Sequence, residues 1–148
     1  MKKTTILSLG MSAAILLSCS GDDNANPQPE VQAQLTGKWE FTEEGLYNPN
    51  GTSSLEPALV NAPGCNKNFY EFNANNVMNE GYYTASPCTL YNLPGTYVKN
   101  ANTLTIDLES EPAETAQIIQ LDATTLKLVF PDNGGGDNRP HLRVYKKV

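Results

Sequence analysis

The chain after residue 34 contains short runs in which apolar and polar side chains alternate. The first run, residues 35–41, places Leu35, Trp39 and Phe41 on one face and polar residues on the other. Alternation with a period of two residues is typical of half-buried β-strands. We therefore predict that the region begins with a strand.

Seven further runs with strand character follow at short spacing, and turn-forming residues separate them. They span residues 68–73, 77–84, 89–100, 103–108, 114–121, 126–130 and 140–147. Short strands joined by tight turns indicate an antiparallel meander, in which each strand pairs with the next. Eight strands suffice to close into a barrel that has no unpaired edge and has room for a small ligand. We predict an all-β, eight-stranded up-and-down barrel, with a two-sheet β-sandwich as the alternative.

Two segments interrupt this pattern. Residues 43–66 include three prolines and four asparagines, which predicts a long loop of the kind that often forms a lid or a binding loop. Residues 131–138 are rich in glycine and include Asp132 and Asp137. Their carboxylate oxygens suit calcium, but a flexible hairpin loop explains the glycines equally well. Calcium at Asp132 and Asp137 is therefore a minor alternative, and we expect no cofactor.

The N-terminal residues differ from the rest in composition. Lys2 and Lys3 precede an apolar stretch at residues 6–17, which is shorter than the about 20 residues of a spanning helix and has the build of a signal peptide. The polar residues that follow, up to residue 34, cannot offset the entropy of ordering, so we expect a disordered tether. The predicted organisation is a signal peptide at residues 1–18, a tether at residues 19–34 and one domain at residues 35–148.

The sequence Leu16-Leu17-Ser18-Cys19 resembles a bacterial lipobox. This resemblance implies cleavage before Cys19, a diacylglycerol group on its thiol and a membrane as partner through that lipid. Ser20, which follows the cysteine, implies an outer-membrane lipoprotein of the cell envelope. The pair Asp22-Asp23 resembles the surface-export signal of Bacteroidetes lipoproteins, and a solvated linker explains the pair equally well.

The charge of the chain excludes one class of partner. The formal net charge is −6, and loss of Lys2 and Lys3 with the signal peptide would make it −8. A chain with this charge is not attracted to nucleic acid or to anionic headgroups. The basic residues are also scattered along the sequence, so we expect no nucleic-acid partner.

Cys65 and Cys88 remain once Cys19 is acylated. Exported domains with two cysteines usually pair them, and these two lie symmetrically about the predicted turn at residues 74–76. They would therefore face each other across the open end of one hairpin. We predict a disulfide between Cys65 and Cys88.

No set of residues indicates catalysis. His141 is the sole histidine, and no nucleophile motif accompanies it. Glu40, Glu71, Glu80 and Asp107 lie on predicted strands, but their spacing selects no glycosidase pair, and we expect them to be outward-facing charges. The sequence therefore predicts a protein that is not an enzyme and has no catalytic residues.

The motifs of the domain are similar to those of lipocalins. Gly37-Lys38-Trp39 resembles the G-x-W signature, which implies that Trp39 closes one end of the barrel and that Arg143 packs over it. The domain more specifically resembles the lipocalin-like domain of Bacteroidetes lipoproteins, on these residues: Leu35, Gly37, Trp39, Cys65, Tyr70, Phe72, Cys88, Gly95 to Tyr97, Leu104 to Ile106 and Val144 to Lys147. The T-D-Y motif of the wider lipocalin family has no counterpart in the chain.

Aromatic residues supply the candidate binding site. Six lie on strand faces that we expect to point inward: Trp39, Phe41, Tyr70, Phe72, Tyr97 and Phe130. They could hold a small apolar ligand or simply fill a packed barrel. Our leading hypothesis is a non-enzymatic, lipid-anchored binding module for a small apolar molecule. The alternative is a packed structural domain that contacts envelope proteins through its loops.

Overall fold

The structure is a computed structural model and describes residues 35–50, 53–131 and 139–148. Within these residues the chain forms one 3-10 turn, η1 (Ala74–Asn76), and nine strands. The strands are β1 (Gly37–Leu46), β2 (Leu55–Pro57), β3 (Phe69–Phe72), β4 (Val77–Tyr83), β5 (Leu90–Asn100), β6 (Thr103–Leu108), β7 (Glu114–Leu121), β8 (Thr125–Phe130) and β9 (His141–Lys147).

Several predictions concern residues outside the described ranges. They are the signal peptide at residues 1–18, the tether at residues 19–34 with its lipidation residue Cys19, and the calcium candidates Asp132 and Asp137. Among the described residues, no helix is long and apolar enough to span a membrane.

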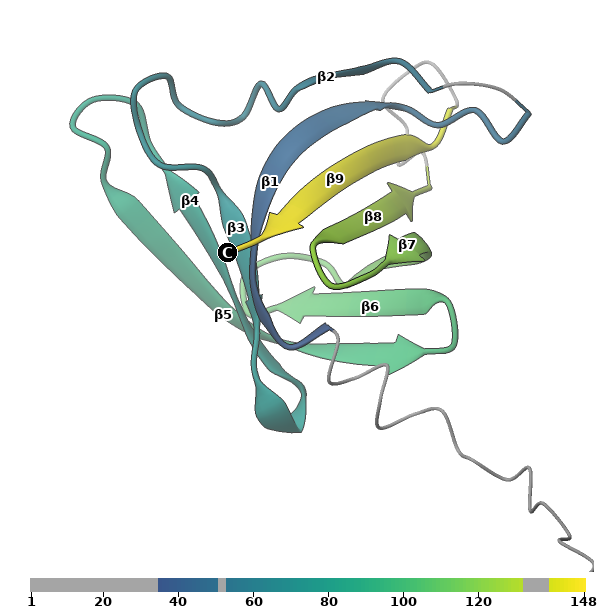
Figure 1. The fold of residues 1–148 in the computed structure, drawn as a ribbon. Coiled ribbons are helices and arrows are strands. Elements are labelled where there is room, and N and C mark those ends of the chain that lie inside the picture. Colours follow the sequence, from purple (N-terminus) through teal and green to yellow (C-terminus); the bar gives the residue numbers. More distant parts are fainter. Residues whose placement is uncertain (1–34, 51–52, 132–138) are drawn as a thin grey trace, which may run out of the picture.

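Eight of the strands close into an antiparallel barrel. Each strand from β3 to β8 pairs with the next, and β1 pairs with β3 on one side and with β9 on the other. Figure 1 shows β1 and β9 side by side at this closure. The structure therefore confirms the all-β, eight-stranded meander, and it has the predicted barrel form rather than that of a β-sandwich.

The prediction of one long loop at residues 43–66 is partly wrong. β1 continues past its predicted end at Phe41 to Leu46, and its last part pairs with the short strand β2. A register shift between Phe41 and Glu43 marks a β-bulge. Because a bulge adds one residue to a strand, it reverses the alternation of inward and outward side chains beyond it. The sequence pattern therefore breaks where the strand itself continues.

One end of the barrel, which we call the closed end, is packed with side chains. Trp39 is fully buried there, and its Nε1 donates a hydrogen bond to the Leu35 carbonyl oxygen at 2.6 Å. The rings of Phe72 and Tyr97 pack edge to face with centroids 5.0 Å apart. The Nζ of Lys147, at the end of β9, lies 5.0 Å from the Trp39 ring. The prediction that Arg143 packs over Trp39 is therefore wrong, and Lys147 takes that position.

Both faces of β9 are covered. Leu142 and Val144 form a second apolar cluster with Val129, against which Tyr47 and Leu55 pack. Tyr145 belongs instead to the main core, and Arg143 lines a cavity inside the barrel. Tyr47, after β1, and Leu55, at the start of β2, therefore cover part of the outer side of β8 and β9. Arg143 and Tyr145, on the opposite face of β9, point into the barrel.

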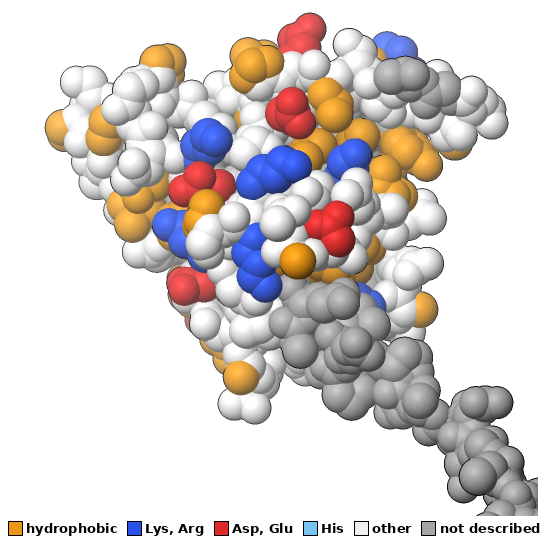
Figure 2. Space-filling view, in the orientation of Figure 1, with side chains coloured by type: hydrophobic (Ala, Val, Ile, Leu, Met, Phe, Trp, Pro, Cys, Tyr) orange, Lys and Arg blue, Asp and Glu red, His pale blue; other side chains and the backbone are white. Residues whose placement is uncertain are grey.

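The outer surface of the barrel carries charges of both signs. Lys38 lies opposite Glu71 on β3, and Glu40 lies opposite Lys146 on β9. Figure 2 shows the Lys and Arg side chains of this face lying among Asp and Glu side chains. Pairs of opposite charge on neighbouring strands stabilise a sheet modestly, and such charges also keep the outer face solvated.

Candidate ligand-binding site

The other end of the barrel, which we call the loop end, is hollow. A cavity of about 850 Å³ lies inside it. The wall includes residues from the seven strands β3 to β9, from the connection between β6 and β7 and from the residue after β8. It consists of Tyr70, Glu80, Tyr82, Leu93, Ile106, Leu108, Glu111 to Thr115, Phe130, Pro131 and Arg143. Eight-stranded barrels can hold one small ligand in such a space.

Much of the cavity wall is apolar or aromatic. Leu93, Ile106 and Leu108 contribute aliphatic surface from β5 and β6, and Phe130 contributes a ring from β8. Tyr82 also lines the cavity, and its ring stacks on Tyr91 with centroids 5.3 Å apart. Figure 1 shows the hairpin of β4 and β5 extending away from the other strands at this end. Such a wall suits the apolar body of a small molecule.

A charged pair of residues lies in the same wall. The Arg143 guanidinium carbon is 4.4 Å from the centroid of the Phe130 ring, a distance typical of a cation–π contact. Glu80 lines the cavity from β4. Burial is the main cause that raises the pKa of Glu80, Arg143 opposes this effect, and Glu114 and Glu111 raise the pKa further. The prediction that Glu80 is an outward-facing charge is therefore wrong.

Two tyrosines lie beside this pair. The rings of Tyr70 and Tyr145 stack with centroids 5.1 Å apart, and their hydroxyl groups share a hydrogen bond. Burial is the main cause that raises the pKa of Tyr70 to about 12 and the pKa of Tyr145 well above its ordinary value. Both hydroxyl groups therefore stay neutral at physiological pH and add polarity without charge.

A second cavity of about 170 Å³ adjoins the first. Tyr70, Glu80 and Arg143 line both cavities, and Phe41 and Glu44 are among the residues that line only the smaller one. Glu44 faces inward because of the bulge between Phe41 and Glu43, which places it opposite Arg143 on β9. The three shared residues therefore lie between the two hollow spaces.

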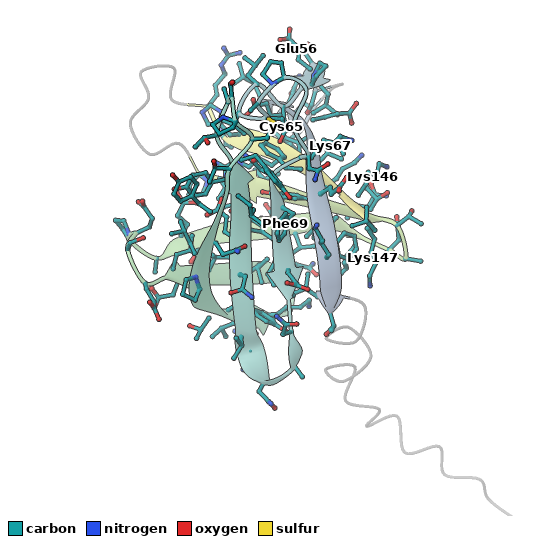
Figure 3. All side chains as sticks on the ribbon, turned by 90° about the vertical axis from the view of Figure 1, so that its left-hand side faces the viewer. Glu56, Cys65, Lys67, Phe69, Lys146 and Lys147 are labelled. Atoms are coloured by element: carbon teal, nitrogen blue, oxygen red, sulfur yellow. A yellow bond between two sulfur atoms is a disulfide. The ribbon has the colours of Figure 1, made fainter. Side chains whose placement is uncertain are left out.

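The predicted disulfide is confirmed, and it lies at the loop end. Cys65 and Cys88 are bonded with their Cα atoms 5.4 Å apart. Figure 3 labels Cys65 in the upper part of the molecule, on the same side of Phe69 as Glu56. The bond joins the connection between β2 and β3 to the connection between β4 and β5.

Two asparagines attach the β2–β3 connection to the barrel. The Asn61 side chain donates to the Phe41 carbonyl oxygen at 2.9 Å and accepts from the Asn68 amide at 2.8 Å. The Asn68 side chain in turn accepts from the Tyr83 amide at 2.8 Å. Hydrogen bonds and the disulfide together hold this long connection against the strands that form the cavity.

The structure divides the six aromatic candidates between the two ends of the barrel. Tyr70 and Phe130 line the larger cavity, and Phe41 and Tyr70 line the smaller one. Trp39, Phe72 and Tyr97 lie in the packed core and line neither cavity. Sequence reasoning missed the inward positions of Glu44, Glu80, Arg143 and Tyr145. The alternation along β9 was visible, but it does not say which face points inward.

His141 is exposed at the start of β9. Within the described ranges, no group of three or more His, Cys, Asp or Glu residues is arranged to hold a metal ion.

Comparisons with known proteins identify the family. The model of the lipocalin-like domain family matches residues 35–128. A lipocalin-like protein from Bacteroides uniformis shares the fold at 16% identity and a TM-score of 0.53, over 78% of this chain and 99% of that chain. A protein from Bacteroides eggerthii does so at 14% identity and a TM-score of 0.50, over 76% of this chain and 98% of that chain. None of the curated proteins compared with the chain matches it.

A closed barrel with an internal cavity is the architecture of a small-molecule binding module. The match covers the strands that form most of this barrel, from β1 into β8. The chain therefore belongs to the lipocalin-like domain family.

Proposed function

We propose that the protein is a non-enzymatic binding module that holds a small molecule with a largely apolar body at the loop end of its barrel. The observation that carries this proposal is the cavity of about 850 Å³. Its size lies within the range of about 300–1,000 Å³ that is usual for ligand pockets. The aliphatic and aromatic part of the wall supplies the surface against which an apolar body is removed from water.

The division of the barrel into two halves supports this proposal over a packed structural domain. The closed end is filled by large side chains such as Trp39 and Phe72, both fully buried. Residues of similar type at the loop end, such as Tyr70 and Phe130, border empty space instead. The packed half stabilises the fold, which leaves the hollow half available for a ligand.

We also propose that Cys19 carries the lipid and anchors the domain at the outer membrane of the cell envelope. The lipobox-like sequence Leu16-Leu17-Ser18-Cys19 supports this proposal. Leu35, at the start of the described domain, accepts a hydrogen bond from Trp39 and so lies at the closed end. A tether that joins the domain at Leu35 would leave the loop end, with its cavity, at the far side from the point of attachment.

A second role, contact with an envelope protein, is favoured by one observation. Leu59 and Val60 are 82% and 57% exposed on the connection between β2 and β3. Two adjacent exposed apolar side chains at the loop end form a small surface that a protein partner could cover.

Fluorescence of N-phenyl-1-naphthylamine, which is uncharged at neutral pH and brightens in apolar surroundings, tests the binding function. We expect saturable binding to the wild-type protein. Leu93→Trp places a larger side chain in the cavity wall and should weaken binding by about tenfold or more, which corresponds to about 1.4 kcal/mol. Leu90→Trp is the matched control, because Leu90 lies on the same strand and lines neither cavity. Equal binding by both variants, or no binding to the wild type, would contradict the proposal.

A further inference from the structure

The charges around the two cavities are unbalanced. Among the described residues, four carboxylates line the two spaces: Glu44, Glu80, Glu111 and Glu114. Arg143 is the one basic residue in the same described walls. When all four carboxylates are ionised, the described walls therefore carry three more formal negative charges than positive charges.

Arg143 is already surrounded by groups that stabilise its charge. Its guanidinium lies over the Phe130 ring at 4.4 Å and 6.0 Å from the Phe41 ring. It also interacts electrostatically with Glu80 and Glu114. An anionic ligand that approached Arg143 would therefore approach these carboxylates as well, and like charges in a cavity with low-dielectric walls repel strongly.

A cationic group meets favourable partners in the same space. Glu80 is partly removed from water and lines both cavities. A positively charged group bound where the two cavities meet would therefore lie close to its carboxylate. Tyr70, Tyr82 and Phe130 are the aromatic residues among those that line the larger cavity, and aromatic rings attract organic cations. Burial is the main cause that raises the pKa of Glu80, Arg143 lowers it, and Glu114 and Glu111 raise it further.

We propose that the natural ligand is an organic cation, an amine or a quaternary ammonium group on an apolar body. Its charged group lies near Glu80, and its body lies against Leu93, Ile106 and Leu108. This inference rests on the proposed binding function and adds the charge of the ligand to it. An apolar carboxylate of the same size should bind more weakly, because the acidic residues of the wall outnumber the one basic residue.

Three compounds with one carbon skeleton test the inference: 4-phenylbutylamine, 4-phenylbutanol and 4-phenylbutanoate. Each competes with the neutral probe N-phenyl-1-naphthylamine on the whole protein at neutral pH and low salt. We expect the amine to bind about tenfold or more tightly than the alcohol, and the carboxylate to bind more weakly than the alcohol, as charge complementarity requires.

Single substitutions test which carboxylate is responsible for the preference for the amine. Glu80→Gln should reduce the preference for the amine over the alcohol, measured as the ratio of their dissociation constants, by about tenfold. Asp107→Asn removes the same charge from an exposed position on the outside of β6 and should leave the preference unchanged. Glu114→Gln, also in the cavity wall, gives a second measurement if Glu80→Gln does not fold.

The outcomes separate the two proposals. Equal binding of amine and alcohol, or tightest binding of the carboxylate, would overturn the cationic ligand while the probe still demonstrates a binding cavity. A preference that persists in both Glu80→Gln and Glu114→Gln would also overturn it. If neither the probe nor any of the three compounds binds, the binding function fails and this inference fails with it.

Discussion

Glu80 is the residue whose environment departs most from that of an ordinary glutamate. Carboxylates are rarely buried without a partner, and Glu80 lines both cavities together with Tyr70 and Arg143. Burial raises its pKa, Arg143 opposes the effect, and Glu114 and Glu111 add to it. The sum of these effects is a group whose ionised form is disfavoured in the folded protein.

The stability of the protein should therefore depend on pH through Glu80. Because the pKa in the folded state is raised above its ordinary value of 4.5, the folded protein binds the proton more tightly than the unfolded chain. The free energy of unfolding is expected to fall as the pH rises from below 4.5 through the raised pKa. Glu80→Gln should remove this loss, so that its stability relative to the wild type increases with pH.

Urea denaturation at a series of pH values between 4 and 8 measures this difference. Asp107→Asn, which removes an exposed carboxylate, is the control for the loss of one negative charge. A difference between Glu80→Gln and wild type that stays constant or shrinks with rising pH would refute the assignment.

Trp39 is the residue on which the closed end depends. It is fully buried, and its indole both donates a hydrogen bond to Leu35 and lies under Lys147. Trp39→Ala should lower the free energy of unfolding by about 3 to 5 kcal/mol, since it leaves a large cavity. Val98→Ala, on a strand residue that is 59% exposed, should change it by less than about 0.5 kcal/mol. A loss below about 1 kcal/mol for Trp39→Ala in urea denaturation would disagree with its burial.

For single residues, the sequence predicted which side chains are buried better than it predicted whether they face the inside or the outside of the barrel. The alternation around Trp39 and Phe41 correctly predicted buried aromatic side chains. The residues Leu142 and Val144 are buried as well, but they face a second cluster outside the barrel. Hydrophobicity alone therefore could not indicate that Arg143 and Tyr145, rather than their apolar neighbours, face the interior.

The connection between β2 and β3 is held in place by contacts that hydrophobic periodicity does not predict. It is held by the disulfide to the connection between β4 and β5, and by Asn61 and Asn68 to β1 and to the end of β4. The positions of the cysteines around the β3–β4 turn were sufficient to predict their pairing. The asparagine contacts were not predictable, because they depend on the fold around them.

Loss of the disulfide should destabilise the protein without unfolding its barrel. The bond closes a loop with a sequence separation of 23 residues, and the chain-entropy model gives roughly 3 kcal/mol for a loop of this length. The double variant Cys65→Ser and Cys88→Ser should therefore unfold at lower urea concentration than the wild type. A reducing agent should shift the wild type in the same direction and leave the double variant unaffected. Insensitivity of the wild type to full reduction would contradict a stabilising role.

The bulge in β1 explains why the sequence predicted the number of barrel strands more reliably than the residues at which each strand ends. Alternation predicted a strand up to Phe41, whereas the strand extends to Leu46 beyond a register shift. The shift turns Glu44 inward, where it lines the smaller cavity. A pattern based on a fixed period of two residues ends at such a position, although the hydrogen bonding between strands goes on.

For the molecule as a whole, the barrel combines a packed half with a hollow half. The number of strands and their order favoured a closed barrel, and the structure bears this out. Whether the interior was filled could not be predicted, because it depends on how the strands spread at the loop end. Apolar side chains lie at both ends of the barrel. At the closed end they pack against one another, whereas at the loop end they are far enough apart to leave a cavity.

The proposed anchor predicts where the molecule is found. In the native bacterial cell, the full chain should incorporate a radiolabelled fatty acid and sediment with the outer membrane. Cys19→Ala should lose the label and leave the outer-membrane fraction. The double variant Cys65→Ser and Cys88→Ser is the matched control and should keep the label. Unchanged labelling of Cys19→Ala would rule out this cysteine as the site of the lipid.

Methyl NMR during a titration with N-phenyl-1-naphthylamine tests the central claim most directly, because it reports where in the barrel a ligand lies. We predict that the methyl signals of Leu93, Ile106 and Leu108 shift in a saturable manner, because these residues line the larger cavity. The signals of Leu104 and Leu126, in the packed core, should move little. Shifts confined to exposed residues such as Leu59, or no shifts at all, would contradict a ligand-binding barrel.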